Sequence, residues 1–166
     1  MSFDNYEQNS LCGCNSALFT VISGSFRKHL LQISLLKKEL EDHHIKVLSP
    51  IGNAAINPNE EFIILETDHF KNPKLLQDSV FAKIRRSSFL VVANIENYLG
   101  NASILEIGYA ISTGIDIYTL EPIKDPNISP YCQPIQKIFH NIDFSNFSKN
   151  HSVNSLKDPR IAKYQN

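Results

Sequence analysis

The most constraining feature of this sequence is a short, continuous apolar run at residues 89–93, followed by a polar loop and a helical pattern. Such a run, rich in β-branched side chains, is typical of a strand buried on both faces of a parallel sheet. Residues 94–101 are rich in Asn and Gly and predict a loop. A helix is then expected to open at Ser103 and to end at Gly114, a C-terminal cap. A buried strand that leads directly into a helix indicates an α/β fold.

The same alternation of strand and helix recurs along the chain. Strands are predicted at 17–22, 46–48, 89–93 and 115–120, and amphipathic helices at 29–42, 74–86 and from 103. Residues 62–65 are apolar and could form either a short strand or an ordered loop segment, of which we expect the loop. A further helix is predicted at 134–140. This order is the pattern of a parallel, doubly wound sheet.

The length of 166 residues suits a single domain. We expect a flexible arm at 1–16, the α/β domain at 17–140 and a polar C-terminal tail at 141–166. No apolar run approaches the roughly 20 residues that span a membrane, and residues 1–10 lack the basic start of a signal peptide. The formal net charge of −1 gives no basic field for nucleic acid.

The cysteines and histidines predict neither a disulfide framework nor a metal site. Cys12, Cys14 and Cys132 are odd in number, and the first two are too close together for the usual zinc spacing. Free thiols indicate a reducing compartment. We therefore expect a cytoplasmic protein without a metal.

Residues Gly24, Ser25, Phe26 and Arg27 form the turn between the first strand and the first helix. This turn lacks the glycine pattern of a dinucleotide fold and that of a P-loop, so no cofactor is expected. Its backbone amides, hydroxyl and guanidinium could hold a small anion or a sugar hydroxyl at a helix N-terminus. An ordinary tight turn with Arg27 facing solvent explains the same residues.

Glu106 is the single acid among the apolar residues of the helix after residues 89–93. It lies just past the carboxyl end of a central strand, where open α/β sheets bind ligands. With Ser103 it also matches a capping box, in which Glu106 would only bond the Ser103 amide. Asp68 is either a second site carboxylate or a turn residue. Two carboxylates without a metal suit chemistry at a glycosidic bond.

These motifs resemble the nucleoside 2-deoxyribosyltransferase-like superfamily, which includes deoxyribosyltransferases and nucleotide N-glycosidases. The resemblance covers roughly residues 17–125, and the matching segments, in the family's order, are 22–27, 61–68, 84–90 and 97–110. It implies a flavodoxin-like sheet and cleavage of the N-glycosidic bond of a nucleoside or its 5′-monophosphate. Water as acceptor would give a hydrolase, and a second base would give a transferase. Members are usually dimers or larger.

The resemblance also implies roles for the loop residues. Glu106 would be the nucleophile, and Ser25 and Arg27 would contact the sugar or its 5′ substituent, which Ser103 would help to hold. Many members carry an aspartate where this chain has Ser87 and Ser88, so Asp68 is assigned as the proton-handling partner. The predicted substrate-binding residues are Gly24, Ser25, Phe26, Arg27, Tyr98, Gly100, Asn101 and Ser103.

An alternative hypothesis is a protein that binds a ligand in the same pocket without catalysing a reaction. On the same fold, a non-catalytic sensor of a nucleotide or related metabolite would retain Arg27 and leave Glu106 as a capping residue. A carboxylate that points into an open cleft, with a raised pKa, would favour the enzyme. A carboxylate turned onto the Ser103 amide would favour the sensor.

Overall fold

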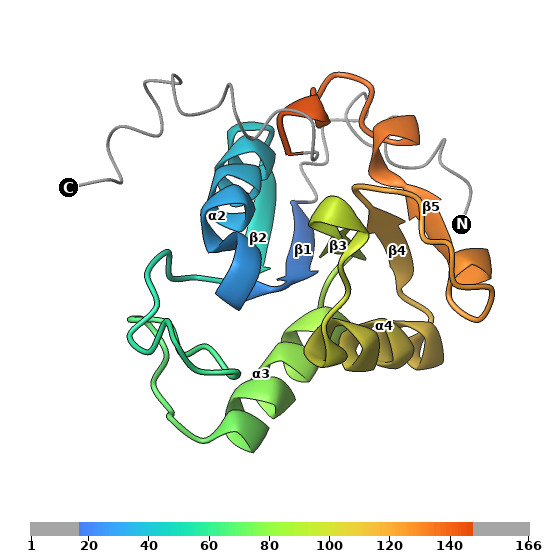
Figure 1. Cartoon of the computed structure of the whole chain (residues 1–166). Helices are drawn as coiled ribbons and strands as arrows, with labels where there is room; N and C mark the ends of the chain where they lie inside the picture. The colour runs from blue at the N-terminus through green and yellow to red at the C-terminus, as the bar shows by residue number, and fades with distance from the viewer. Residues whose placement is uncertain (1–16, 148–166) are drawn as a thin grey trace.

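A five-stranded, all-parallel sheet forms the centre of the computed structural model, which describes residues 17–147 (Figure 1). The strand order is β2-β1-β3-β4-β5. This confirms the predicted α/β class and is the arrangement of a single, flavodoxin-like domain. The strands are β1 (Leu18–Gly24), β2 (Ile45–Ser49), β3 (Phe89–Ala93), β4 (Asp116–Thr119) and β5 (Cys132–Pro134).

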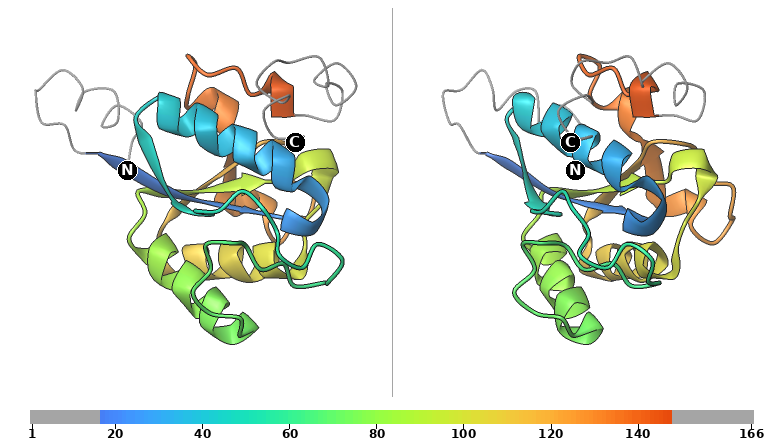
Figure 2. Two further views of the ribbon diagram at one scale, coloured as in Figure 1. Left: turned by 90° about the vertical axis from the view of Figure 1, so that its left-hand side faces the viewer. Right: turned by 60° about the vertical axis from the view of Figure 1, so that its left-hand side comes forward.

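Helices cover both faces of this sheet. They are α2 (Phe26–Asp42), α3 (Pro73–Arg85) and α4 (Asn101–Thr113). Helix α2 lies on one face, and α3 and α4 lie on the other (Figures 1 and 2). The ends follow from local sequence: Ser25 caps α2, Asn72 caps α3, and Gly114 ends α4 with a φ of 72°. Glycine adopts this left-handed conformation without the penalty that a Cβ brings.

The alternation of side chains along the central strands divides the core between the two faces. In β1 and β3, Ile22 and Val91 pack on the side of α2. Val21 and Val92 pack on the side of α3 and α4. All residues of β3 are buried, as expected for a central parallel strand with helices on both sides.

The structure differs from the sequence prediction at several boundaries. Helix α2 begins at Phe26 rather than residue 29, and α4 begins at Asn101 rather than Ser103. The predicted helix at 134–140 is only a 3₁₀ turn, Ile135–Lys137, which follows the unpredicted strand β5. A strand as short as β5 carries too few residues for a visible alternation.

The packed core also reaches beyond residue 140. Ile142, Phe144 and Phe147 are buried and belong to the core cluster on the α2 side. This corrects the expected start of the polar tail at residue 141. The arm at 1–16, with Cys12 and Cys14, and the tail from 148 to 166 lie outside the described residues.

Residues 50–72 connect β2 to α3 as a long loop, hereafter the β2–α3 loop, which passes between α2 and α3 (Figure 2). It is held by its own hydrogen bonds. Ala55 and Leu65 form an antiparallel bridge. The Glu66 carboxylate accepts from the amides of Asn53 and Ala54 at 2.9 and 2.8 Å. The expectation of an ordered, non-strand segment at 62–65 is therefore confirmed.

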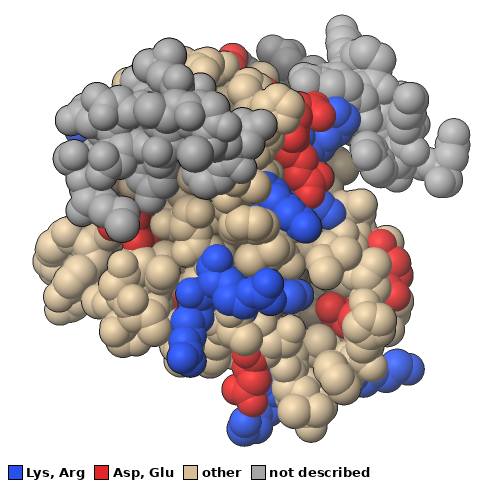
Figure 3. Space-filling view, turned by 180° about the vertical axis from the view of Figure 1, so that it is seen from behind, with Lys and Arg blue, Asp and Glu red and all other residues tan. Residues whose placement is uncertain are grey.

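The surface seen from behind is mostly uncharged, with basic side chains gathered near its centre and acidic ones above, below and to the right of them (Figure 3). Among the helices of residues 17–147, none has the length and apolar character needed to cross a membrane.

Candidate active site

A cavity of about 440 Å³ opens at the carboxyl ends of β1 and β2, beside the loop that follows β3. Its walls come from the N-termini of α2 and α4, from α3 and from the β2–α3 loop. Every residue predicted for the site lines this one cavity, although the residues are scattered in the sequence: Gly24, Ser25, Phe26, Arg27, Asp68, Tyr98, Gly100, Asn101, Ser103 and Glu106.

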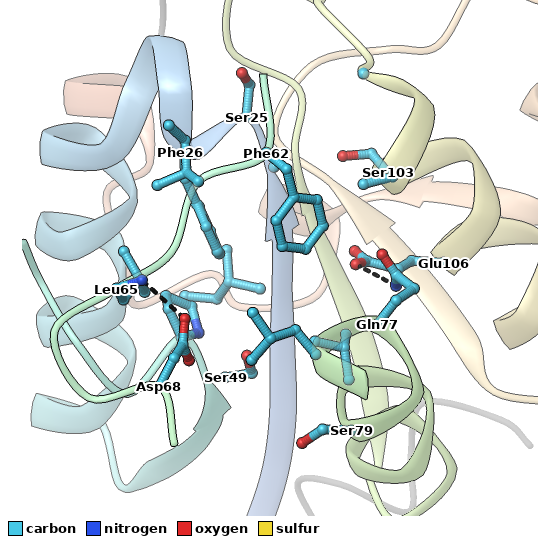
Figure 4. Close-up of a pocket in the computed structure, with 18 of the residues that line it drawn as sticks. Ser25, Phe26, Ser49, Phe62, Leu65, Asp68, Gln77, Ser79, Ser103 and Glu106 are labelled. Atoms are coloured by element: carbon cyan, nitrogen blue, oxygen red, sulfur yellow. Dashed lines mark hydrogen bonds between the residues drawn. The ribbon is translucent and has the colours of Figure 1, made fainter. Parts of the chain in front are cut away.

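Glu106 is buried, with 8% of its surface exposed, and both of its carboxylate oxygens accept a hydrogen bond. The hydroxyl of Ser23, at the end of β1, donates to Oε2. The side-chain amide of Gln77, on α3, donates to Oε1 at 3.0 Å (Figure 4). Two different elements therefore fix the position of this carboxylate at the cavity wall.

The capping box suggested by Ser103 and Glu106 does not form. Helix α4 has Gly100 at its N-cap and begins at Asn101, so Ser103 lies within the first turn. A capping box needs the serine at the N-cap itself. The Glu106 carboxylate is instead directed to Ser23 and Gln77.

Burial raises the pKa of the Glu106 carboxyl, because desolvation disfavours its charged form. The hydrogen bonds from Ser23 and Gln77 act in the opposite direction. The net result is a carboxyl that ionises at a higher pH than an ordinary glutamate. Such a perturbed acid in a cavity is a common property of functional sites.

One end of the cavity, hereafter the helix end, is formed by the N-termini of α2 and α4. These helices have 17 and 13 residues, and their N-terminal dipoles favour an anion. Ser103 is only 3% exposed, and its hydroxyl has no hydrogen-bond partner among residues 17–147, yet it points into the cavity (Figure 4). Ser25 accepts from the amide of Lys28 at 3.3 Å, which leaves its own proton free to donate. Arg27 also lines this end.

Tyr98 is both a wall of the cavity and a fastening for its loop. The Lys28 ammonium lies 3.7 Å from the centre of the Tyr98 ring, a cation–π contact. The edge of His29 packs against the same ring, with 6.4 Å between centroids. The loop itself is tied to the chain after β4, where the Asn94 amide donates to the Glu121 carbonyl at 2.7 Å.

Asp68 lies toward the opposite end of the cavity from Ser103 (Figure 4). One of its oxygens, Oδ2, accepts from the Leu65 amide at 2.8 Å. This hydrogen bond is typical of a turn residue, which is one of the two roles predicted for Asp68. The side chain nevertheless remains part of the cavity lining, where Ser49 and Ser79 also lie.

The residues that hold Glu106 were not predicted from the sequence. Neither Ser23, which directly precedes the turn at Gly24, nor Gln77 is among the predicted site residues. A signal for Gln77 was present: it is a polar residue on the inward stripe of α3, beside Leu76 and Val80. Phe62 and Lys83 also line the cavity and were not predicted as site residues.

The chemistry open to this site is that of carboxylates and hydrogen-bond donors. Within residues 17–147, no three His, Cys, Asp or Glu side chains gather into a group that could hold a metal ion. Cys132 is a free thiol, and burial raises its pKa to about 11, so it stays protonated at neutral pH.

No family model matches the chain, and no curated protein matches it. The resemblance to the nucleoside 2-deoxyribosyltransferase-like superfamily stays a prediction drawn from the sequence motifs.

Proposed function

We propose that this protein cleaves, or transfers at, the N-glycosidic bond of a nucleoside or nucleoside 5′-monophosphate, with Glu106 as the nucleophile. The observation that carries the proposal is the placement of the Glu106 carboxylate. It is buried, held by Ser23 and Gln77, and part of the cavity lining. A volume of about 440 Å³ lies within the range of small-molecule sites.

In the first step, the bond between C1′ and the base nitrogen breaks, and its electron pair stays on the base. A carboxylate oxygen of Glu106 forms an ester bond to C1′ as the base leaves. The departing base takes up a proton, and Asp68 is the proposed partner for that transfer. The hydrogen bonds from Ser23 and Gln77 hold the attacking carboxylate in one orientation, which lowers the entropy cost of reaching the transition state.

In the second step, water attacks C1′ and its oxygen remains on the sugar. One proton of the water replaces the proton given to the base, and Glu106 leaves as a carboxylate. The products are the free base and the sugar or sugar phosphate. If a second base attacks in place of water, the same intermediate gives a new nucleoside.

The helix end of the cavity suits the 5′ side of the substrate. A 5′-phosphate placed there would meet two helix N-termini, the free hydroxyl of Ser103 and the guanidinium of Arg27. The base would then extend past Glu106 toward Asp68, with the ring of Phe62 in the cavity wall.

We also propose that the protein is a homo-oligomer. Ile104 and Leu105 are 45% and 58% exposed on the outer face of α4. Burial of such side chains against a second copy would stabilise the assembly by about 1.5–3 kcal/mol for each fully buried side chain. Sedimentation of the wild type and of Leu105→Glu tests this: a dimer or larger that becomes a monomer in the variant supports it, and a wild-type monomer rejects it.

The experiment that tests the activity is a chromatographic screen for free base. The protein is incubated with ribo- and deoxyribonucleosides and their 5′-monophosphates, with and without an added acceptor base, beside Glu106→Gln. Base release that is lost in the variant supports hydrolysis, and base exchange only with the acceptor supports transfer. Binding of these compounds without turnover would reject the enzyme and favour the sensor.

A further inference from the structure

The cavity has a second polar end, hereafter the base end, formed by Ser49, Asp68 and Lys83. Ser49 and Asp68 lie away from Ser25 and Ser103 (Figure 4). Lys83 follows Ser79 on the same face of α3, since residues four apart in a helix are neighbours. The base end is therefore separated from the helix end, with Glu106 between them.

Each residue of the base end has unused hydrogen-bonding capacity. Ser49 is 8% exposed, and its hydroxyl has no partner within residues 17–147. In the same part of the chain, the half-buried ammonium of Lys83 makes neither an ion pair nor a side-chain hydrogen bond. Asp68 uses Oδ2 for the Leu65 amide and keeps Oδ1. Polar groups left unpaired in a cavity favour a ligand that pairs them.

The base end carries one negatively charged side chain, Asp68, and one positively charged side chain, Lys83. Burial lowers the pKa of Lys83, and the nearby Asp68 carboxylate, which stabilises the charged form of the lysine, opposes that shift in part. A carboxylate and an ammonium in one place disfavour a second phosphate, because its charge would meet Asp68. They favour a neutral group that presents an acceptor to Lys83 and a donor to Asp68.

Among the purine bases, the 6-oxopurines present this pair of groups on one edge. The carbonyl oxygen at position 6 accepts from an ammonium, the usual partner of guanine in proteins. The adjacent ring N–H donates to a carboxylate. Adenine in the same pose reverses both groups, so its amine would face Lys83 and its bare ring nitrogen would face Asp68.

The spacing of Gln77 and Lys83 along α3 agrees with a purine. Gln77 holds Glu106 at one point of the helix, and Lys83 lies roughly 9 Å further along the helix axis. This separation is comparable to the long dimension of a purine base. A pyrimidine attached at the same C1′ position would end short of Lys83.

We propose that Ser49, Asp68 and Lys83 read the edge of the base and select 6-oxopurine nucleosides or nucleotides, those of hypoxanthine and guanine. Lys83 donates to the carbonyl oxygen, the Asp68 carboxylate accepts from the ring N–H, and the Ser49 hydroxyl hydrogen-bonds to the same edge. For these bases Asp68 therefore holds the ring N–H, and the proton that the departing base takes up comes from solvent, which recovers one from the attacking water in the second step. As the glycosidic bond breaks, the carbonyl oxygen gains negative charge, which the Lys83 ammonium stabilises. This proposal rests on the proposed function.

The test compares the nucleoside 5′-monophosphates of hypoxanthine and adenine, which are identical except at this edge of the base. We expect the wild type to favour hypoxanthine in kcat/KM by about 10-fold or more. Lys83→Met should reduce that ratio to about 1, mainly through loss of the hypoxanthine reaction. The control is Lys74→Met, on the same helix, where the exposed Lys74 only pairs with Asp78; it should keep the ratio.

The outcomes separate this inference from the proposed function. Turnover of both nucleotides with equal efficiency in the wild type, or an unchanged ratio in Lys83→Met, overturns base selection and leaves the activity standing. If neither is turned over, calorimetric binding of the same two nucleotides decides: tighter binding of hypoxanthine, lost in Lys83→Met, supports the base end. Equal binding, or none, overturns it. Should Lys83→Met fail to fold, the wild-type ratio alone decides.

Discussion

The side-chain amide of Gln77 donates a hydrogen bond of 3.0 Å to Oε1 of Glu106, which joins α3 to α4 across the cavity wall. Together with the Ser23 hydroxyl on Oε2, this bond leaves the carboxylate little freedom to rotate. A carboxylate with both oxygens held by donors is preorganised for attack at one position. The first prediction follows from this relationship.

Gln77→Met keeps a side chain of similar length and removes the donor to Glu106. Because this hydrogen bond lowers the pKa of Glu106, its loss should raise that pKa further. We expect kcat/KM to fall by about 10-fold or more, and the acid limb of its pH profile to move to higher pH. A Gln77→Met profile with an unmoved acid limb would show that Gln77 only packs. Asp78→Asn, the exposed neighbour of Gln77, is the control.

Glu106→Gln should change how stability depends on pH. Burial raises the pKa of Glu106 in the folded protein, so the folded state holds this proton more tightly than the unfolded state. The wild type therefore loses stability as the pH rises through the folded pKa. The glutamine variant cannot ionise and should be more stable at pH 8 by about 0.5–2 kcal/mol. Urea unfolding at pH 5 and pH 8 measures the free energy of unfolding of both proteins. A variant that is as much more stable than the wild type at pH 5 as at pH 8 would contradict this prediction.

Ser103→Ala should affect ligand binding and leave folding almost unchanged, since its hydroxyl has no hydrogen-bond partner within residues 17–147. A hydrogen bond to a charged phosphate contributes about 1.5–3 kcal/mol. We therefore expect binding of 5′-monophosphates to weaken by about 10-fold or more, with little change for nucleosides. Ser112→Ala, at the exposed end of the same helix, is the control. Equal losses for both ligand classes would place the phosphate elsewhere.

Gly24→Ala should destabilise the fold next to the site. A Cβ at Gly24 would lie 2.8 Å from Cδ1 of Ile33 and 3.2 Å from Cβ of Ala93, so the fully buried Ile33 side chain and Ala93 would have to shift. Overpacking of this kind costs about 1–3 kcal/mol. Gly108→Ala is the matched control, because a Cβ there has nothing within 4 Å and gains about 1 kcal/mol of helix propensity. Thermal unfolding that ranks the two variants in the opposite order would contradict this packing.

The sequence predicted the fold and the grouping of the site loops because both depend on strong, local patterns. The apolar run at Phe89–Ala93 is buried along its whole length, and its position places the next loop and helix at the carboxyl edge of the sheet. Parallel topology then brings the turn after β1 to the same edge. Glu106 therefore had to lie near Arg27, although the two are far apart in the chain.

The sequence could not predict what holds Glu106 or what closes the cavity. A capping box depends on where a helix begins, and Gly100 rather than Ser103 takes the N-cap of α4. The contact with Gln77 is set by the packing of α3 against α4, which no local pattern encodes. The β2–α3 loop contributes Phe62 and Asp68 to the cavity through its own network of hydrogen bonds, which likewise follows from no periodicity.

The most direct test of the account is to trap the bond between Glu106 and the sugar. The nucleotide or nucleoside that is cleaved fastest is synthesised with fluorine at C2′, which destabilises the oxocarbenium-like transition states and lets the covalent intermediate accumulate. Intact-protein mass spectrometry should show one added glycosyl group, and peptide mapping should place it on Glu106. No adduct should form in Glu106→Gln. Base release from this analogue without an adduct, or an adduct on another residue, would contradict the assignment of Glu106 as the nucleophile.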